Sequence, residues 1–299
     1  MDRGPTCRSV ADRYDVGTDG TMPIASGDQV VSLPGDTGPV GASPIPRPTS
    51  SYRELPPPAA LAAHVECLWV HLIGDGEGTY HQPVFPDGRM DVVALGDEVL
   101  VAGPASRSTT LSLVPGTLTV GVRFRSGAAP ALVGTSAADL RDRDVAPADV
   151  WGRSGAEMAD RVVEADVWED RLGVMVDHLT GRLGRSRALD PVGVGIAGVL
   201  AEGPGRPLPQ LAEDVGLSER QLRRRVEDAV GYPPRLLARI LRFQRFLRAA
   251  RAAGPGRDLA RLAAEAGYAD QAHLTRESRR LGGLPPAALL DWESARLAG

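Results

Sequence analysis

The sequence contains no lysine, and all 34 of its basic residues are arginine. It is also rich in alanine, glycine and proline, and this combination indicates the coding bias of a GC-rich genome. The arginine content by itself therefore does not predict a nucleic-acid partner.

Cysteine and long apolar runs are also scarce. Cys7 and Cys67 are too few for the framework of a disulfide-rich secreted domain, and they fit a reducing compartment. No apolar run approaches the ~18 residues that a membrane span needs. No apolar stretch follows the first arginine as it would in a secretory signal. We therefore expect a cytoplasmic protein with no membrane association.

The chain is long enough for two domains, and its charge is unevenly distributed. The 299 residues are 42% hydrophobic and 24% charged, which is typical of globular proteins. Residues 206–299 hold 17 Arg against 11 Asp and Glu, whereas the remainder holds 17 Arg against 27 acidic residues. This split is typical of a polyanion-binding module joined to an acidic partner domain.

The sequence divides into four segments. Residues 1–50 contain seven Pro and seven Gly without a sustained period, which predicts a disordered tail. Residues 51–153 contain short apolar runs between turn residues and predict a β-rich, barrel-like domain with a sensor or dimerisation role. Residues 154–189 carry helical apolar stripes and predict a connector, and residues 190–299 predict an all-α domain. The clearest expected strands are 65–73, 90–94, 98–102, 109–114 and 117–124.

Two stretches of the last segment resemble each other. A Leu-Ala pair at 211–212 and again at 262–263 opens a short helix, and Gly216 and Gly267 end these helices five residues after the leucine. A small or polar residue then begins a second helix with one apolar face. Helix, glycine-containing turn and helix is the pattern of a helix-turn-helix unit, so the segment predicts two such units.

The second helix of each unit, which we call the reading helix, exposes side chains suited to DNA. Arg binds O6 and N7 of guanine, Gln pairs with adenine, and a Thr methyl contacts thymine. A single arginine-rich face is more often merely solvated, but two such helices in matched contexts favour DNA. The candidate DNA-binding residues are Ser218, Arg220, Gln221, Arg223, Arg224 and Arg225 in the first unit, and Gln271, His273, Thr275 and Arg276 in the second.

A long helix is expected to join the two units. Residues 234–253 begin with Pro at the first helical position and carry an apolar stripe. Twenty helical residues span ~30 Å at ~1.5 Å per residue, which is close to the ~34 Å of one turn of B-DNA. We expect this helix to present both reading helices to successive major grooves on one face of the duplex.

These motifs resemble the AraC/XylS family of bacterial transcriptional regulators. The matching signatures are LSERQLRR at 217–224 and AGYADQAHLTR at 266–276, and the resemblance covers essentially all of residues 190–291. The family usually has an aromatic residue at the position of Ser278 and another near Gly282, so their loss predicts a looser second reading helix. The resemblance implies base-facing positions at Arg220, Arg223, Arg224, Gln271, His273, Thr275 and Arg276.

The front half resembles an uncharacterised N-terminal domain found on some members of that family. The matching stretches are HQPVFPDGRMD at 81–91 and GVRFRSGAA at 121–129. The resemblance implies a cupin-like sensor or dimerisation domain and names no ligand. The candidate effector-binding residues are His81, Arg89, Arg123 and Arg125. The three arginines either hold an anionic effector or pair with carboxylates such as Asp87 and Asp91 at the mouth of a barrel, and the pairing is the favoured interpretation.

The spacing of metal-binding residues disfavours a catalytic centre. His64, Cys67, His71 and His81 match no standard zinc pattern, and in a strand His64 and Cys67 would point to opposite faces. His81 with two nearby aspartates is too small a set for an iron oxygenase. The sequence has no nucleophile elbow, phosphate loop or H-E-x-x-H motif. We therefore expect no metal, no cofactor and no enzymatic activity.

Together these features predict an α+β multidomain protein with a β-rich, barrel-like N-terminal domain, a helical connector and an all-α C-terminal domain with two helix-turn-helix units. The predicted function is sequence-specific transcriptional regulation in response to a small-molecule effector. The expected partners are double-stranded promoter DNA, the effector, RNA polymerase and a second copy of the chain. Two alternatives stay open: a metal-dependent enzyme or DNA-repair fusion targeted by its C-terminal domain, and an interaction scaffold that has lost DNA binding.

Overall fold

The computed structural model describes residues 50–74, 78–203, 207–253 and 258–290. The predicted tail lies outside these ranges apart from Ser50, and so does Cys7. All statements below concern the described residues.

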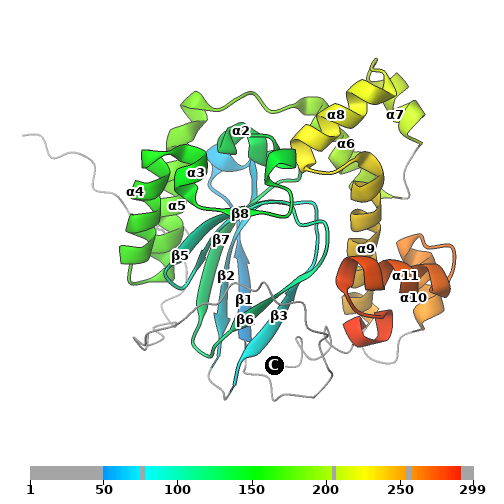
Figure 1. The fold of residues 1–299 in the computed structure, drawn as a ribbon, viewed down its shortest axis with the longest axis horizontal. Helices are drawn as coiled ribbons and strands as arrows, with labels where there is room; N and C mark the ends of the chain where they lie inside the picture. Colours follow the sequence, from blue (N-terminus) through cyan, green and yellow to red (C-terminus); the bar gives the residue numbers. More distant parts are fainter. Residues whose placement is uncertain (1–49, 75–77, 204–206, 254–257, 291–299) are drawn as a thin grey trace, which may run out of the picture.

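The N-terminal domain is built on a six-stranded antiparallel sheet with the strand order β1-β2-β7-β4-β5-β8, and β3 pairs with β6 in a separate two-stranded sheet. The prediction of a β-rich domain is confirmed. The larger sheet stays open, with β1 and β8 at its edges (Figure 1). The strands are β1 (Ser50–Leu55), β2 (Val65–Ile73), β3 (Tyr80–Val84), β4 (Asp91–Leu95), β5 (Glu98–Ala102), β6 (Thr109–Leu113), β7 (Leu118–Phe124) and β8 (Asp144–Val145).

One face of this sheet is covered by helices α4 (Arg153–Glu164) and α5 (Trp168–Arg182) (Figure 1). Because side chains alternate along a strand, Leu68, Val92 and Val122 point to this face and share one hydrophobic core with the two helices. The segment expected to act as a connector is thus part of the packing of the sheet. Shorter helices complete the domain: η1 (Ala59–Leu61), α2 (Ala129–Val133), η2 (Ala137–Leu140), α3 (Pro147–Trp151) and η3 (Leu183–Arg185).

The C-terminal domain is helical, as predicted, and its long helix has the predicted bounds. Figure 1 shows this helix, α9, running between the two helix-turn-helix units. A single core that includes Leu222, Phe243, Phe246 and Leu274 joins all the helices. None of the described helices is long and apolar enough to cross a membrane. The helices are α6 (Pro191–Glu202), α7 (Leu208–Asp214), α8 (Glu219–Val230), α9 (Pro234–Ala253), α10 (Leu259–Ala266) and α11 (Gln271–Gly282).

Local sequence sets the ends of the two reading helices, α8 and α11. The Asp270 side chain accepts a hydrogen bond from the backbone N–H of His273 at 2.6 Å and so caps the start of α11. Each helix ends at a glycine with positive φ, 82° at Gly231 and 72° at Gly283. Glycine adopts this left-handed conformation without a Cβ clash, so it ends a helix cleanly.

The two domains contact each other alongside α9. The ring of Phe85 packs edge-on against Phe243 with ring centroids 5.8 Å apart, and Gln244 Nε2 donates to the carbonyl of Pro86 at 2.7 Å. Residues 104–108, between β5 and β6, contact both helix-turn-helix units. Tyr232 Oη donates to the Ala105 carbonyl at 2.6 Å, and the Ser108 N–H donates to the Leu281 carbonyl at 2.9 Å.

Candidate nucleic-acid interface

The first half of α8 presents three arginines to solvent. Arg220, Arg223 and Arg224 are exposed, and none forms an ion pair with another described residue. The opposite face of the helix is buried through Leu222 and Val226. Unpaired guanidinium groups on a rigid helix are available to phosphates and guanines. The structure thus brings together three of the residues that the sequence proposed for DNA.

Ser218 and Gln221 form a capping box at the start of α8. The Ser218 N–H donates to Gln221 Oε1 at 2.9 Å, and the Gln221 N–H donates to Ser218 Oγ at 3.3 Å. These contacts satisfy backbone donors that would otherwise lack partners at a helix start. The two side chains therefore fix the position of α8, while the amide nitrogen of Gln221 is left outside this box.

Arg225 differs from its neighbours because it is held by a carboxylate. Its Nε and Nη2 donate to the two oxygens of Asp190 at 2.9 and 2.7 Å. Asp190 also caps α6, accepting from the Val192 N–H at 3.0 Å. This bidentate pair ties α8 to the start of α6, so Arg225 positions the reading helix in this structure.

On α11, Gln271, Thr275 and Arg276 line one shallow groove. Thr275 Oγ1 donates to the Gln271 carbonyl one turn earlier at 2.8 Å, which leaves its methyl group for contact with a partner. His273 is less accessible, since its ring packs edge-on against Tyr268 with centroids 5.2 Å apart. Three of the four predicted residues of the second unit thus share one surface.

The second reading helix is held firmly against α9. Arg239 Nε and Nη2 donate to the two Glu277 oxygens at 2.6 and 2.9 Å, with both side chains largely buried. A Cβ at Gly282 would lie 2.8 Å from the Phe243 ring. The space near Gly282, where the family usually carries an aromatic residue, is therefore filled by an aromatic ring from α9. Ser278 is fully buried, and its hydroxyl has no hydrogen-bond partner among the described residues.

The structure adds one candidate that the sequence analysis missed. A cleft of about 320 Å³ lies where α8 leads into α9, and it is lined by Leu208, Arg223, Pro233, Pro234 and Arg235. Arg235 is exposed and forms no ion pair with another described residue. It is the second residue of α9, and the proline before it had indicated only a helix start, so the sequence carried no signal for Arg235.

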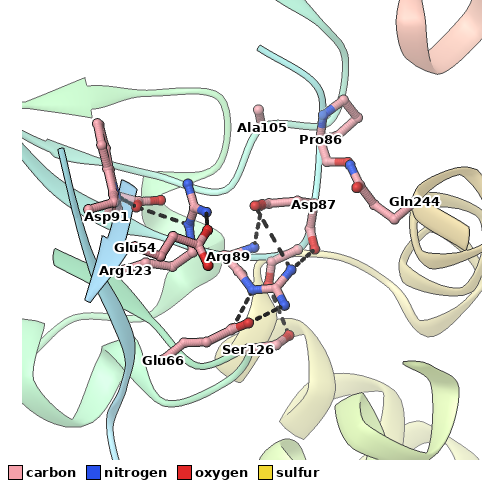
Figure 2. Close-up of polar contacts among 12 residues, drawn as sticks. Glu54, Glu66, Pro86, Asp87, Arg89, Asp91, Ala105, Arg123, Ser126 and Gln244 are labelled. Carbon is pink, nitrogen blue, oxygen red and sulfur yellow. Dashed lines mark hydrogen bonds and ion pairs between the residues drawn. The ribbon is translucent and has the colours of Figure 1, made fainter. Parts of the chain in front are cut away.

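Figure 2 shows the surroundings of Arg89 and Arg123, two of the candidate effector residues. Arg89 donates to both Glu66 oxygens, at 2.5 and 2.7 Å, and its backbone N–H donates to Asp87 Oδ1 at 2.9 Å. Arg123 Nε lies 3.2 Å from Asp91 Oδ1. Burial raises the pKa of Asp91, and the Arg123 charge opposes that rise. Both guanidinium groups are therefore engaged with carboxylates.

The other two effector candidates lie apart from this pair. Arg125 Nε donates to the Ala62 carbonyl at 2.8 Å, and His81 on β3 lies 3.3 Å from Ser112 of β6. The structure therefore does not gather the four candidates into one pocket. Of the three arginines, Arg89 and Arg123 pair with carboxylates of the sheet, and Arg125 bonds to a backbone carbonyl.

The histidines and the cysteine considered for a metal are also separated. Among the described residues no group of three or more His, Cys, Asp and Glu is placed to hold a metal ion. Cys67 is buried, and burial raises the pKa of its thiol to about 11. It is therefore a poor nucleophile at neutral pH.

Comparison with known protein families agrees with both halves of the sequence analysis. Residues 211–291 match a family described as a helix-turn-helix domain, and residues 53–146 match one described as a domain of unknown function (DUF6597). The prediction of a helix-turn-helix domain in the C-terminal segment is confirmed. A helix-turn-helix domain of this kind supports a DNA-binding transcriptional regulator.

Two solved structures show a distant similarity. ToxT from Vibrio cholerae O395 has 11% sequence identity and a TM-score of 0.41, covering 71% of this chain and 95% of that chain. An apo variant of ToxT from Vibrio cholerae strain SCE256 has the same identity and TM-score, covering 75% and 96%. A similarity this distant does not establish a shared function. No curated protein matches the chain.

Proposed function

We propose that the chain reads promoter DNA by placing α8 and α11 in successive major grooves. The observation that carries this proposal is the row of exposed, unpaired arginines at 220, 223 and 224 on the first half of α8. Residues near the start of a reading helix are those that reach base edges in helix-turn-helix proteins. The surface of Gln271, Thr275 and Arg276 on α11 supplies the second contact.

The supporting contacts give each proposed residue a role. Arg220, Arg223, Arg224 and Gln221 read bases or phosphates, while Ser218 and Arg225 position α8. On α11, Gln271, Thr275 and Arg276 read the second site, with His273 packed beside them. The two bidentate pairs, Arg225 with Asp190 and Arg239 with Glu277, keep the reading helices rigid, which lowers the entropy lost on binding.

The proposal extends to the other segments. Residues 51–153 form the sensing or dimerising domain, 154–189 support its sheet, and 190–299 bind DNA. Contacts from residues 104–108 to both units offer a path by which a small effector in the N-terminal domain changes DNA affinity. An anionic effector would have to displace Glu66 or Asp91 from Arg89 or Arg123. RNA polymerase and a second copy of the chain complete the proposed set of partners.

The experiment measures fluorescence anisotropy of full-length protein with DNA from its own upstream region and with a scrambled duplex, at two salt concentrations. Arg224→Ala is expected to lose about 1–3 kcal/mol of preference for the specific duplex, because a bidentate base contact disappears. Arg153→Ala is the control, because Arg153 is an exposed arginine on α4 of the N-terminal domain. Its replacement should change DNA affinity little.

Arg235→Gln tests the cleft in the same assay. Because we assign Arg235 to a phosphate, affinity should fall by a similar factor for both duplexes. The slope of log affinity against log salt concentration should also become shallower by about one. The ratio of specific to scrambled binding should not change. Failure of wild-type protein to bind either duplex at low salt would contradict the proposed function and favour a scaffold that has lost DNA binding.

A further inference from the structure

The reading face of α8 continues beyond its arginines. In a helix, residues four apart lie on the same side, so Glu227 follows Arg223 and Asp228 follows Arg224 on that face. A duplex seated on the first half of α8 would therefore extend towards Glu227 and Asp228 in the second half.

That second half is already occupied by the N-terminal domain. Arg141 Nη1 lies 3.4 Å from Glu227 Oε1 and donates to the Gly231 carbonyl at 3.2 Å. Ser136 Oγ donates to the Asp228 carbonyl at 3.3 Å and lies 3.4 Å from Asp228 Oδ1. Both side chains flank η2 (Ala137–Leu140), the segment of the N-terminal domain that packs along α8.

The end of α8 is held closely at the same place. A Cβ on Gly231 would lie 2.4 Å from Pro104 Cγ and 3.0 Å from the Ala137 carbonyl, so only glycine allows this approach. The next residue, Tyr232, is fully buried and bonded to Ala105. Figure 1 shows this end of α8 next to α2 and the sheet domain.

The size of the major groove limits what can enter with the helix. The groove is about 12 Å wide, and a helix with its side chains is about 10–12 Å across. A reading helix therefore fills the groove, and a second segment of chain lying on its reading face cannot enter beside it.

We propose that residues 136–141 occlude the second half of the reading face of α8, so that DNA and the N-terminal domain compete for this helix. The proposal rests on the proposed function, since it assumes that α8 enters the groove. The structure is then a low-affinity state, and full binding requires η2 to move away from Glu227 and Asp228.

A direct contact of Arg141 with DNA would have the opposite effect on affinity, so the two roles can be distinguished. If Arg141 instead lent a positive charge to the DNA interface, its removal would weaken binding. If it holds the occluding segment in place, its removal strengthens binding. The sign of the change in affinity therefore decides between the two.

The test compares Arg141→Ala with Arg143→Ala in the anisotropy assay with the upstream duplex. Both variants remove one positive charge, but Arg143 lies just outside residues 136–141, is exposed, and donates from its Nη1 to the Asp139 carbonyl within the N-terminal domain at 3.2 Å. We expect Arg141→Ala to bind about two- to tenfold more tightly, because a partly exposed pair and one hydrogen bond no longer favour the occluded state. Arg143→Ala should bind equally or more weakly.

Ser136→Ala provides a second variant without a change of charge, and it too should bind more tightly. In hydrogen exchange, DNA should increase the exchange of residues 136–141. Weaker or unchanged binding by both Arg141→Ala and Ser136→Ala, in a protein whose wild type binds specifically, would overturn the occlusion and leave the proposed function intact. Absence of binding by every variant would instead overturn the proposed function, and the occlusion with it.

Discussion

His178 is a half-buried residue of α5 that faces Trp151 at the end of α3. Its ring lies 4.7 Å from that of Trp151, and its Nε2 is buried without a hydrogen-bond partner among the described residues. Burial, and then the charge of Arg182, lowers the pKa of His178 from 6.5 to about 4. The site therefore disfavours protonation in the folded protein.

This histidine should make stability depend on pH. The unfolded chain takes up a proton on His178 near pH 6.5 and the folded protein only near pH 4, so between these values the unfolded state binds more protons. The free energy of unfolding should therefore fall as pH drops through this window. Urea titrations should show a shallower fall for His178→Gln than for wild type. The exposed-site control His81→Gln should follow wild type, and parallel curves for all three would contradict the assignment.

At the scale of single residues, the sequence predicted which kinds of side chain α8 carries better than it predicted which residues those side chains contact. Arg224 and Arg225 are adjacent and chemically identical, yet only Arg225 finds a carboxylate, Asp190, 35 residues earlier. Such a pairing depends on how α6 packs against α8, and periodicity does not report that packing. The same reason explains why Arg235 and Arg141 were missed.

At the scale of elements, Gly231, which ends α8, can be compared with Gly216 in the turn before α8. Gly216 has φ 66° and open space where a Cβ would lie, whereas Gly231 has φ 82° and lies against Pro104. Gly216→Ala should cost about 1–2 kcal/mol for the left-handed backbone alone. Gly231→Ala should cost about 1–3 kcal/mol more, because the methyl overlaps Pro104. Urea denaturation measures both, and equal losses would show that the domains separate easily at this point.

The helices of the second half could be predicted almost to the residue, because their ends carry strong local signals. Ser218 and Asp270 cap the reading helices, and α9 has the predicted bounds 234–253. Strand β3 was not predicted, since Pro83 lies within it and proline is uncommon in strands. Strand β8 has two residues, too few to show alternation.

At the scale of the whole molecule, the division into a β-rich N-terminal domain and a helical C-terminal domain could be predicted from the sequence pattern. The contact between the two domains could not. The segments of the N-terminal domain that contact the helical domain include a turn at 85–86, a loop at 104–108 and residues 136–141, and none of them has a periodic pattern. These segments matter because the fold brings them close to the helical domain, and no local sequence pattern marks them. The contact between the two domains is therefore a property of the folded chain.

The loop at 104–108 has a consequence for how promoter occupancy changes. Because Ala105 bonds to the first unit and Ser108 to the second, a displacement of this loop acts on both units in the same step. Under the proposed function, the two half-sites of an operator should then gain or lose protection together as the effector is titrated, with coincident midpoints in nuclease footprints. Separate midpoints would mean that the two helix-turn-helix units respond to the effector independently.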